Sequence, residues 1–174
     1  TSAFTIFVLS GAVSAATDPQ SIAVGGASLI PTLKVEQSHD DNIFSKPSDE
    51  KSSTETSLIP RLEYYAEKNE QNYLSVSYDG DYTRYWDSRD DDYEDHTFGV
   101  SGAYSRSDMF RLSGDASTAR LHDDRGTGAS EGVNAETEGS PDEYDKDQAG
   151  VMIDIGREQA RFGASFSART IGTE

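Results

Sequence analysis

The residues of this chain best suited to chemistry are charged and hydroxyl side chains at every second position of extended segments. In the segment 73–85, for example, Ser75 and Ser77 alternate with the apolar Leu74 and Val76. A period of two places such side chains together on one face of a β-strand. Guanidinium, carboxylate and hydroxyl groups on one face contact water, ions and sugar hydroxyls. We predict that ten residues of this kind line a water-filled lumen: Arg61, Glu63, Ser75, Ser77, Asp79, Asp81, Arg111, Asp115, Asp154 and Arg161.

Other reactive residue types do not combine into a recognisable catalytic, metal or cofactor site. Two histidines, His39 and His122, each begin a His-Asp-Asp triplet, and His96 begins another predicted strand. A metal site would require these positions to converge in space, which their spacing does not indicate. No nucleophile elbow is present, and the glycine pair in 123–128 lacks the Gly-Lys-Ser/Thr of a phosphate loop. We therefore predict no catalytic residue, no metal and no cofactor. One alternative is an outer-membrane enzyme whose site lies in a missing C-terminal part.

The elements that position the polar residues are seven alternating segments. Their connections are alternately long and short, and long strands with this alternation are typical of transmembrane β-barrels. The sequence thus predicts an all-β fold, an antiparallel up-and-down transmembrane β-barrel, rather than a soluble sandwich with shorter strands. The predicted strands are 27–38, 55–67, 73–85, 96–106, 109–121, 148–157 and 160–170.

Composition agrees with a sheet that is apolar on one face only. The chain has 174 residues and a net charge of −17, with 34% hydrophobic but 10% aromatic residues. High charge and low hydrophobicity alone would predict disorder, which the aromatics and the alternation oppose. The negative charge excludes nucleic acid as a partner, because phosphate binding needs clustered Lys and Arg. There is no cysteine, which excludes disulfides and thiolate chemistry.

The acidic residues concentrate in predicted loops, notably Asp87–Asp95 and Asp142–Asp147. The simplest interpretation is a pair of solvated, self-repelling loops. A sharper one is weak binding of divalent cations that connect these loops to lipopolysaccharide. The same feature leaves a rival function open, namely a secreted or surface β-sandwich adhesin with acidic calcium-binding loops.

An aromatic patch ends the segment 73–85 and includes Tyr82, Tyr85 and Trp86. Aromatic residues at the end of a membrane-spanning strand are typical of an interfacial girdle. Ordinary cross-strand aromatic packing is the alternative.

The two ends of the chain predict a secreted barrel that is incomplete. The apolar run 3–13 and the small residues 14–16 resemble the core and cleavage site of a signal peptide, so we expect a partial signal peptide over 1–16. Residues 17–26 are then a periplasmic lead-in. Because bacterial barrels have an even number of strands, seven strands predict that 27–174 is the N-terminal part of a longer barrel. The expected location is the outer membrane of a Gram-negative bacterium.

Four segments resemble outer-membrane proteins of the "putative β-barrel porin 2" type. They are PTLKVEQSHDDNIF (31–44), SLIPRLEY (57–64), YDGDYTRYWDSRDDDYEDH (78–96) and HDDRGTG (122–128). The resemblance implies an outer-membrane porin-like protein associated with exopolysaccharide or capsule biosynthesis, and it supplies no catalytic residues. We therefore expect a conduit or accessory in exopolysaccharide export or assembly. Its expected partners are outer-membrane lipid, lipopolysaccharide, polysaccharide and the export machinery.

Overall fold

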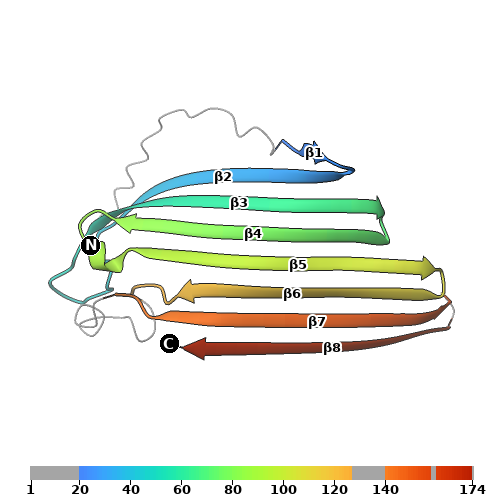
Figure 1. The fold of residues 1–174 in the computed structure, drawn as a ribbon. Helices are drawn as coiled ribbons and strands as arrows, with labels where there is room; N and C mark the ends of the chain where they lie inside the picture. Colours follow the sequence, from blue (N-terminus) through green and yellow to red (C-terminus); the bar gives the residue numbers. More distant parts are fainter. Residues whose placement is uncertain (1–19, 127–139, 158–159, 174) are drawn as a thin grey trace.

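The computed structural model describes residues 20–126, 140–157 and 160–173, which form one antiparallel sheet whose strands follow one another in chain order (Figure 1). The predicted signal segment 1–16 lies outside these residues. One 3-10 turn, η1, covers Arg89–Asp91. The strands are β1 Ile22–Val24, β2 Ala27–Asp40, β3 Ser53–Asn69, β4 Asn72–Tyr85, β5 Tyr93–Ser107, β6 Phe110–His122, β7 Glu143–Arg157 and β8 Ala160–Thr173.

The seven predicted strands correspond to β2–β8, and their up-and-down antiparallel order is confirmed. The short strand β1 lies within the predicted lead-in, and three residues are too few to show a period of two. A turn of Gly25 and Gly26, with φ of +57° and +88°, folds β1 back onto β2. Positive φ at both central residues is typical of the tight hairpin turns that glycine adopts at low cost.

The connections alternate in length as the sequence predicts. Two-residue turns, 25–26, 70–71 and 108–109, lie at one end of the sheet. The long connections 41–52, 86–92 and 123–142 lie at the other end, although part of the last is outside the described residues (Figure 1). The described strands form one sheet rather than two packed sheets, which does not fit the alternative of a β-sandwich.

Strand β7 begins at Glu143, five residues before its predicted start at 148. The acidic stretch predicted as a loop pairs instead with β6, where Asp145 lies opposite Arg120 and Lys146 opposite Ala119. The ladder therefore continues past the point where apolar residues stop. Alternation does not reveal this part of a strand, because both of its faces are polar.

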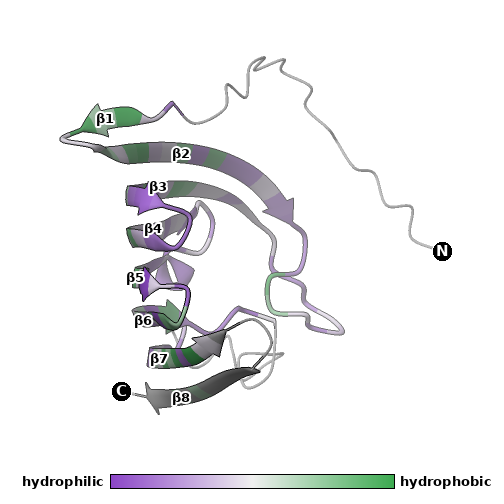
Figure 2. Cartoon of the chain, turned by 90° about the vertical axis from the view of Figure 1, so that its right-hand side faces the viewer, coloured by the Kyte–Doolittle hydropathy of each residue, from purple (hydrophilic) through white to green (hydrophobic). Residues whose placement is uncertain are grey.

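The ladder register sorts side chains onto an apolar face and a polar face. Large apolar side chains lie directly opposite one another and are unusually exposed, with Leu33 and Val35 each 64% accessible. Figure 2 shows β2 and β3 bending toward the side on which the loop after β2 lies. One apolar row crosses six strands: Leu29, Tyr64, Val76, Val100, Ala116 and Ala149.

The apolar band runs obliquely across the strands. On β2 it covers Leu29–Val35, centred on Thr32, whose row reaches Lys146 on β7. On β7 the band covers Ala149–Ile155 and is centred on Met152. This centre lies six residues further along β7 than Lys146, the position in the same row as Thr32. Six residues of about 3.3 Å, over five strand spacings of about 4.8 Å, correspond to an inclination of roughly 40°. That inclination lies within the strand tilt of about 35–45° in outer-membrane barrels.

We predict that an arginine is costly on the apolar face and tolerated on the adjacent polar position. Val100→Arg, near the middle of the band on β5, should make folding into lipid bilayers less favourable by about 2–4 kcal/mol. Ser101→Arg, one residue along, should change it little. Urea titrations in vesicles, followed by the heat-dependent shift in SDS gel mobility, measure both. Equal costs at the two positions would contradict a lipid-facing band.

Candidate functional site: the polar face and its loop cover

The register places all ten predicted lumen residues on the same face of the sheet. Arg61 lies opposite Asp79, and Glu63 lies opposite Ser77. Further along the sheet Ser101 lies opposite Asp115, and Arg111 lies opposite Asp154, which keeps β6 and β7 in phase with β4. Arg161 is opposite Gly156 on β7 at the matching position, and its side chain lies outside the described part.

Charged and hydroxyl groups form cross-strand contacts on this face. Arg61 Nε lies 3.4 Å from Asp79 Oδ1. The Ser75 hydroxyl donates to Glu63 Oε1 at 3.2 Å. Both interactions link β3 to β4 between half-exposed side chains, so the groups remain accessible to water. Such exposed pairs contribute at most about 1 kcal/mol each, and their main effect here is to fix where charge lies.

Small residues leave room around one carboxylate of the polar face. Gly150 lies opposite Asp115, and a Cβ added at Gly150 would be 3.1 Å from Asp115 Oδ1. Ser101 is the cross-strand neighbour of Asp115 on the other side. A larger residue at 150 would therefore press on the carboxylate.

Two tyrosines add aromatic surface to the polar face near its two-residue turns. The rings of Tyr65 and Tyr73 stack with their centroids 6.0 Å apart. Both belong to the same face as Glu63 and Ser75. Their role is not evident from the alternation of apolar and charged residues, because tyrosine is compatible with either face.

The predicted interfacial aromatics divide between the two faces. Tyr82 and Trp86 lie on the apolar side, where the Trp86 indole N–H donates to Thr56 Oγ1 at 3.0 Å and the side chain is 59% exposed. Tyr85 lies instead on the polar face and is buried with Ile43. Residues 82 and 85 differ by an odd number, so they cannot share a face of one regular strand.

Tyr82 is part of an aromatic cluster on the apolar face. The Tyr78 hydroxyl is 2.9 Å from the Tyr82 hydroxyl and 3.0 Å from His96 Nδ1, and the Tyr78 ring packs on Phe98 at 4.9 Å. The sequence predicts His96 at the start of a strand, whereas it lies inside β5, which begins three residues earlier. The cluster joins polar tips to aromatic rings, a composition typical of a membrane interface.

The long loops fold over the polar face and form a buried cluster, which we call the loop cover. It comprises Ile43, Phe44, Tyr85 and Tyr93 together with the ion pair Asp91–Arg125. Arg125 Nε lies 2.7 Å from Asp91 Oδ1, and both side chains are at most 3% exposed. Removing one partner of such a buried pair typically costs roughly 3–5 kcal/mol, because the other charge is left uncompensated.

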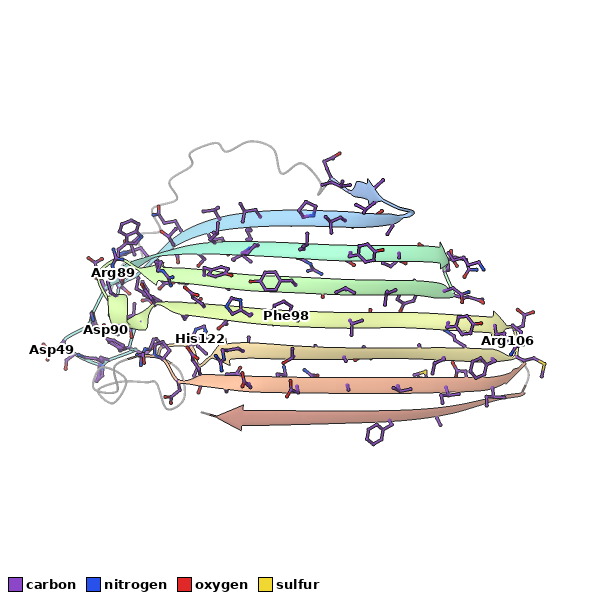
Figure 3. The ribbon with its side chains drawn as sticks, in the orientation of Figure 1. Asp49, Arg89, Asp90, Phe98, Arg106 and His122 are labelled. Atoms are coloured by element: carbon purple, nitrogen blue, oxygen red, sulfur yellow. The ribbon has the colours of Figure 1, made fainter. Side chains whose placement is uncertain are left out.

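His122 connects the start of the third long loop to β5 at the loop end of the sheet. The ring of His122 stacks on Tyr93 with centroids 3.5 Å apart, and its Nδ1 lies 2.9 Å from Asp95 Oδ1. Figure 3 shows His122 toward the loop end of the sheet, where Asp49, Arg89 and Asp90 also lie, and Arg106 at the opposite, turn end. His39 contacts Thr54 at 3.2 Å.

Among the described residues, no group of three or more His, Asp or Glu side chains is arranged to hold a metal ion. No helix in the same part of the chain is long and apolar enough to cross a membrane.

We predict that Trp86 reports the level of the membrane interface. Because it is the only tryptophan, its fluorescence can be assigned without ambiguity. Lipids brominated near the headgroup should quench it more strongly than lipids brominated near the end of the acyl chain. A Val76→Trp substitution in a Trp86→Phe background is the matched control and should show the reverse order. Equal quenching at the two positions would contradict the assigned depth.

Comparison with known proteins agrees with this geometry. The family model described as "Putative beta-barrel porin 2" matches residues 15–171, which include every described strand from β1 to β7 and nearly all of β8. No curated protein and no solved structure gives a significant match. This match is in keeping with a sheet that has one exposed apolar face and one polar face. The chain belongs to the β-barrel porin 2 family.

Proposed function

We propose that this sheet is part of the wall of a porin-like barrel in the outer membrane of a Gram-negative bacterium. Its polar face lines a water-filled passage. The observation that carries the proposal is the oblique apolar band. An inclination of roughly 40° is the tilt that closed membrane barrels require of their strands.

The polar face supplies the chemistry of the passage. Among the ten predicted lumen residues, three are arginines and five are carboxylates, so the wall carries both signs with an acidic excess. Facing arginine and carboxylate groups set a transverse field across a pore and so influence which ions pass. Hydroxyl groups between them hydrogen-bond to water and to neutral solutes.

We further propose that the passage serves exopolysaccharide export or assembly. The supporting features are the family resemblance, the hydroxyl and carboxylate groups of the wall, and the stacked rings of Tyr65 and Tyr73. Sugar hydroxyls pair with carboxylates and serines, while the C–H faces of sugars pack on aromatic rings. Lipopolysaccharide and outer-membrane lipid are the proposed neighbours of the apolar face, and the export machinery is the proposed partner at the periplasmic end.

Water access on alternate residues tests the passage. The natural sequence has no cysteine, so single cysteines report one position each. Ser75→Cys and Ser77→Cys in outer-membrane vesicles should react with a small, charged thiol reagent at least about ten-fold faster than Leu74→Cys and Val76→Cys. Similar rates at all four positions would contradict a wet face and a lipid face on one strand.

Loss of the protein tests the polysaccharide role. In a strain without it, surface exopolysaccharide should fall and polymer should accumulate inside the outer membrane. The native protein should restore surface polymer, whereas the Val100→Arg variant should restore less, because it folds poorly into lipid. Unchanged surface polymer would refute the export role and leave the porin assignment intact.

A further inference from the structure

We infer that the loop cover is a fixed constriction at the outer mouth of the passage, locked by Asp91 and Arg125, and that it favours cations and neutral solutes over anions. The inference rests on the proposed function, because a constriction requires a passage. It assigns a size-limiting and charge-selecting role to residues whose positions in the sequence indicate only solvated loops.

The first observation is that the loop after β2 has an apolar core of its own. Ile43 and Phe44 are only 3% and 2% exposed. They pack against Tyr85, whose side chain belongs to the polar face of β4. This loop therefore turns inward over the polar face and does not extend into solvent. Burial of two large apolar side chains contributes about 1.5–3 kcal/mol each and favours the inward position of the loop.

The second observation is that the three long connections are joined to one another. Asp91 in the second loop pairs with Arg125 in the third, and also accepts a hydrogen bond from the Ser88 hydroxyl. Lys51, at the end of the first loop, donates to the same Ser88 hydroxyl. A change at this pair is thus felt in all three loops.

Two cation-π contacts meet at Phe44. The Lys51 ammonium lies 5.4 Å from the centre of the Phe44 ring and the Arg125 guanidinium 5.7 Å from it. Such contacts strengthen when water is excluded. Phe44 is accordingly the contact shared by the first and third loops.

Two strand positions beside the loops are closed to water. Ser53 and Thr83 have polar side chains on the polar face, and both are 0% exposed. Thr83 donates to Asp81 at 2.9 Å and lies 2.6 Å from the Ser57 hydroxyl. Deeper on the same strand, Ser75 and Ser77 remain partly exposed. The polar face is thus closed at its loop end and open further in.

The charge of the loop cover sets the expected selectivity. Residues 41–52, 86–92, 123–126 and 140–142 contain ten acidic and four basic side chains. One of each is neutralised by the buried Asp91–Arg125 pair, so the remaining excess is exposed and negative. A narrow opening with this excess repels anions and admits cations and neutral molecules. The polymer that fits is an uncharged saccharide chain and not a polyanionic one.

Single-channel recording of the native protein in planar bilayers tests the constriction. The Arg125→Gln and Phe44→Ser variants should each raise the conductance by about two-fold or more and admit larger polyethylene glycols. Phe44→Ser changes no charge, so its wider opening should also weaken the preference for K⁺ over Cl⁻. Asp90→Asn, an exposed neighbour of Asp91 in η1, is the matched control and should leave the conductance within error. Unchanged conductance and size limit in both loop variants would overturn the inference.

Thiol access to position 83 provides a test that does not require the loop variants to conduct. Thr83→Cys should resist a bulky, charged thiol reagent in the otherwise native protein and should react once Arg125→Gln is added. Rapid reaction of Thr83→Cys alone would show that the loops do not cover the polar face, and would overturn the inference. If the native protein forms no channels, the proposed passage fails, whereas protection of Thr83 still measures the cover separately.

Discussion

The hydrogen-bond register of the antiparallel ladder is the constraint on which the rest of the structure depends. Because side chains alternate with a period of two, a slip of one residue in any pair would move a whole strand's apolar set to the other face. Across six long pairings no such slip occurs within the apolar band, and the two irregularities, at 67–69 and 105–107, lie beside the two-residue turns. The short turns fix this register, and the contacts between apolar side chains in each row stabilise it.

The two ends of the sheet have different tasks. At the turn end, two-residue connections fix the register of neighbouring strands, and few side chains are buried. At the loop end, the chain forms its only compact core among the described residues, around Phe44 and Tyr85. There the aliphatic band has ended, and the buried apolar side chains come from the loop after β2 and from Tyr85 and Tyr93. Folding inward lets these loops bury the apolar side chains that they carry.

Much of the fold could be predicted from the sequence, because alternation and register report the same physical fact. The seven long strands, their order and the common face of the ten polar residues all follow from a period of two. The early start of β7 could not be predicted, since pairs such as Asp145 and Arg120 show no alternation in hydropathy. Tyr85 is predicted to belong to the interfacial aromatics because it lies next to Trp86 in the sequence. Adjacent residues of a strand point to opposite faces, however, so the two side chains lie on different faces.

The loop cover could not be predicted for a different reason. Asp91 and Arg125 are 34 residues apart by their numbering and belong to acidic stretches that read as solvated loops. Only the closeness of their strands in the sheet brings them together. Ile43 and Phe44 are the one local signal, because two adjacent large apolar residues are unusual in a loop so rich in Asp, Ser and Lys.

The inclination of the apolar band is the most specific quantity in the structure, and polarised infrared spectroscopy measures it directly. In oriented bilayers that contain the native protein, the dichroism of the amide I and amide II bands gives the mean tilt of the strands from the membrane normal. We expect a tilt of about 35–45°. Strands lying close to the membrane plane, or without preferred orientation, would contradict a sheet that crosses the bilayer.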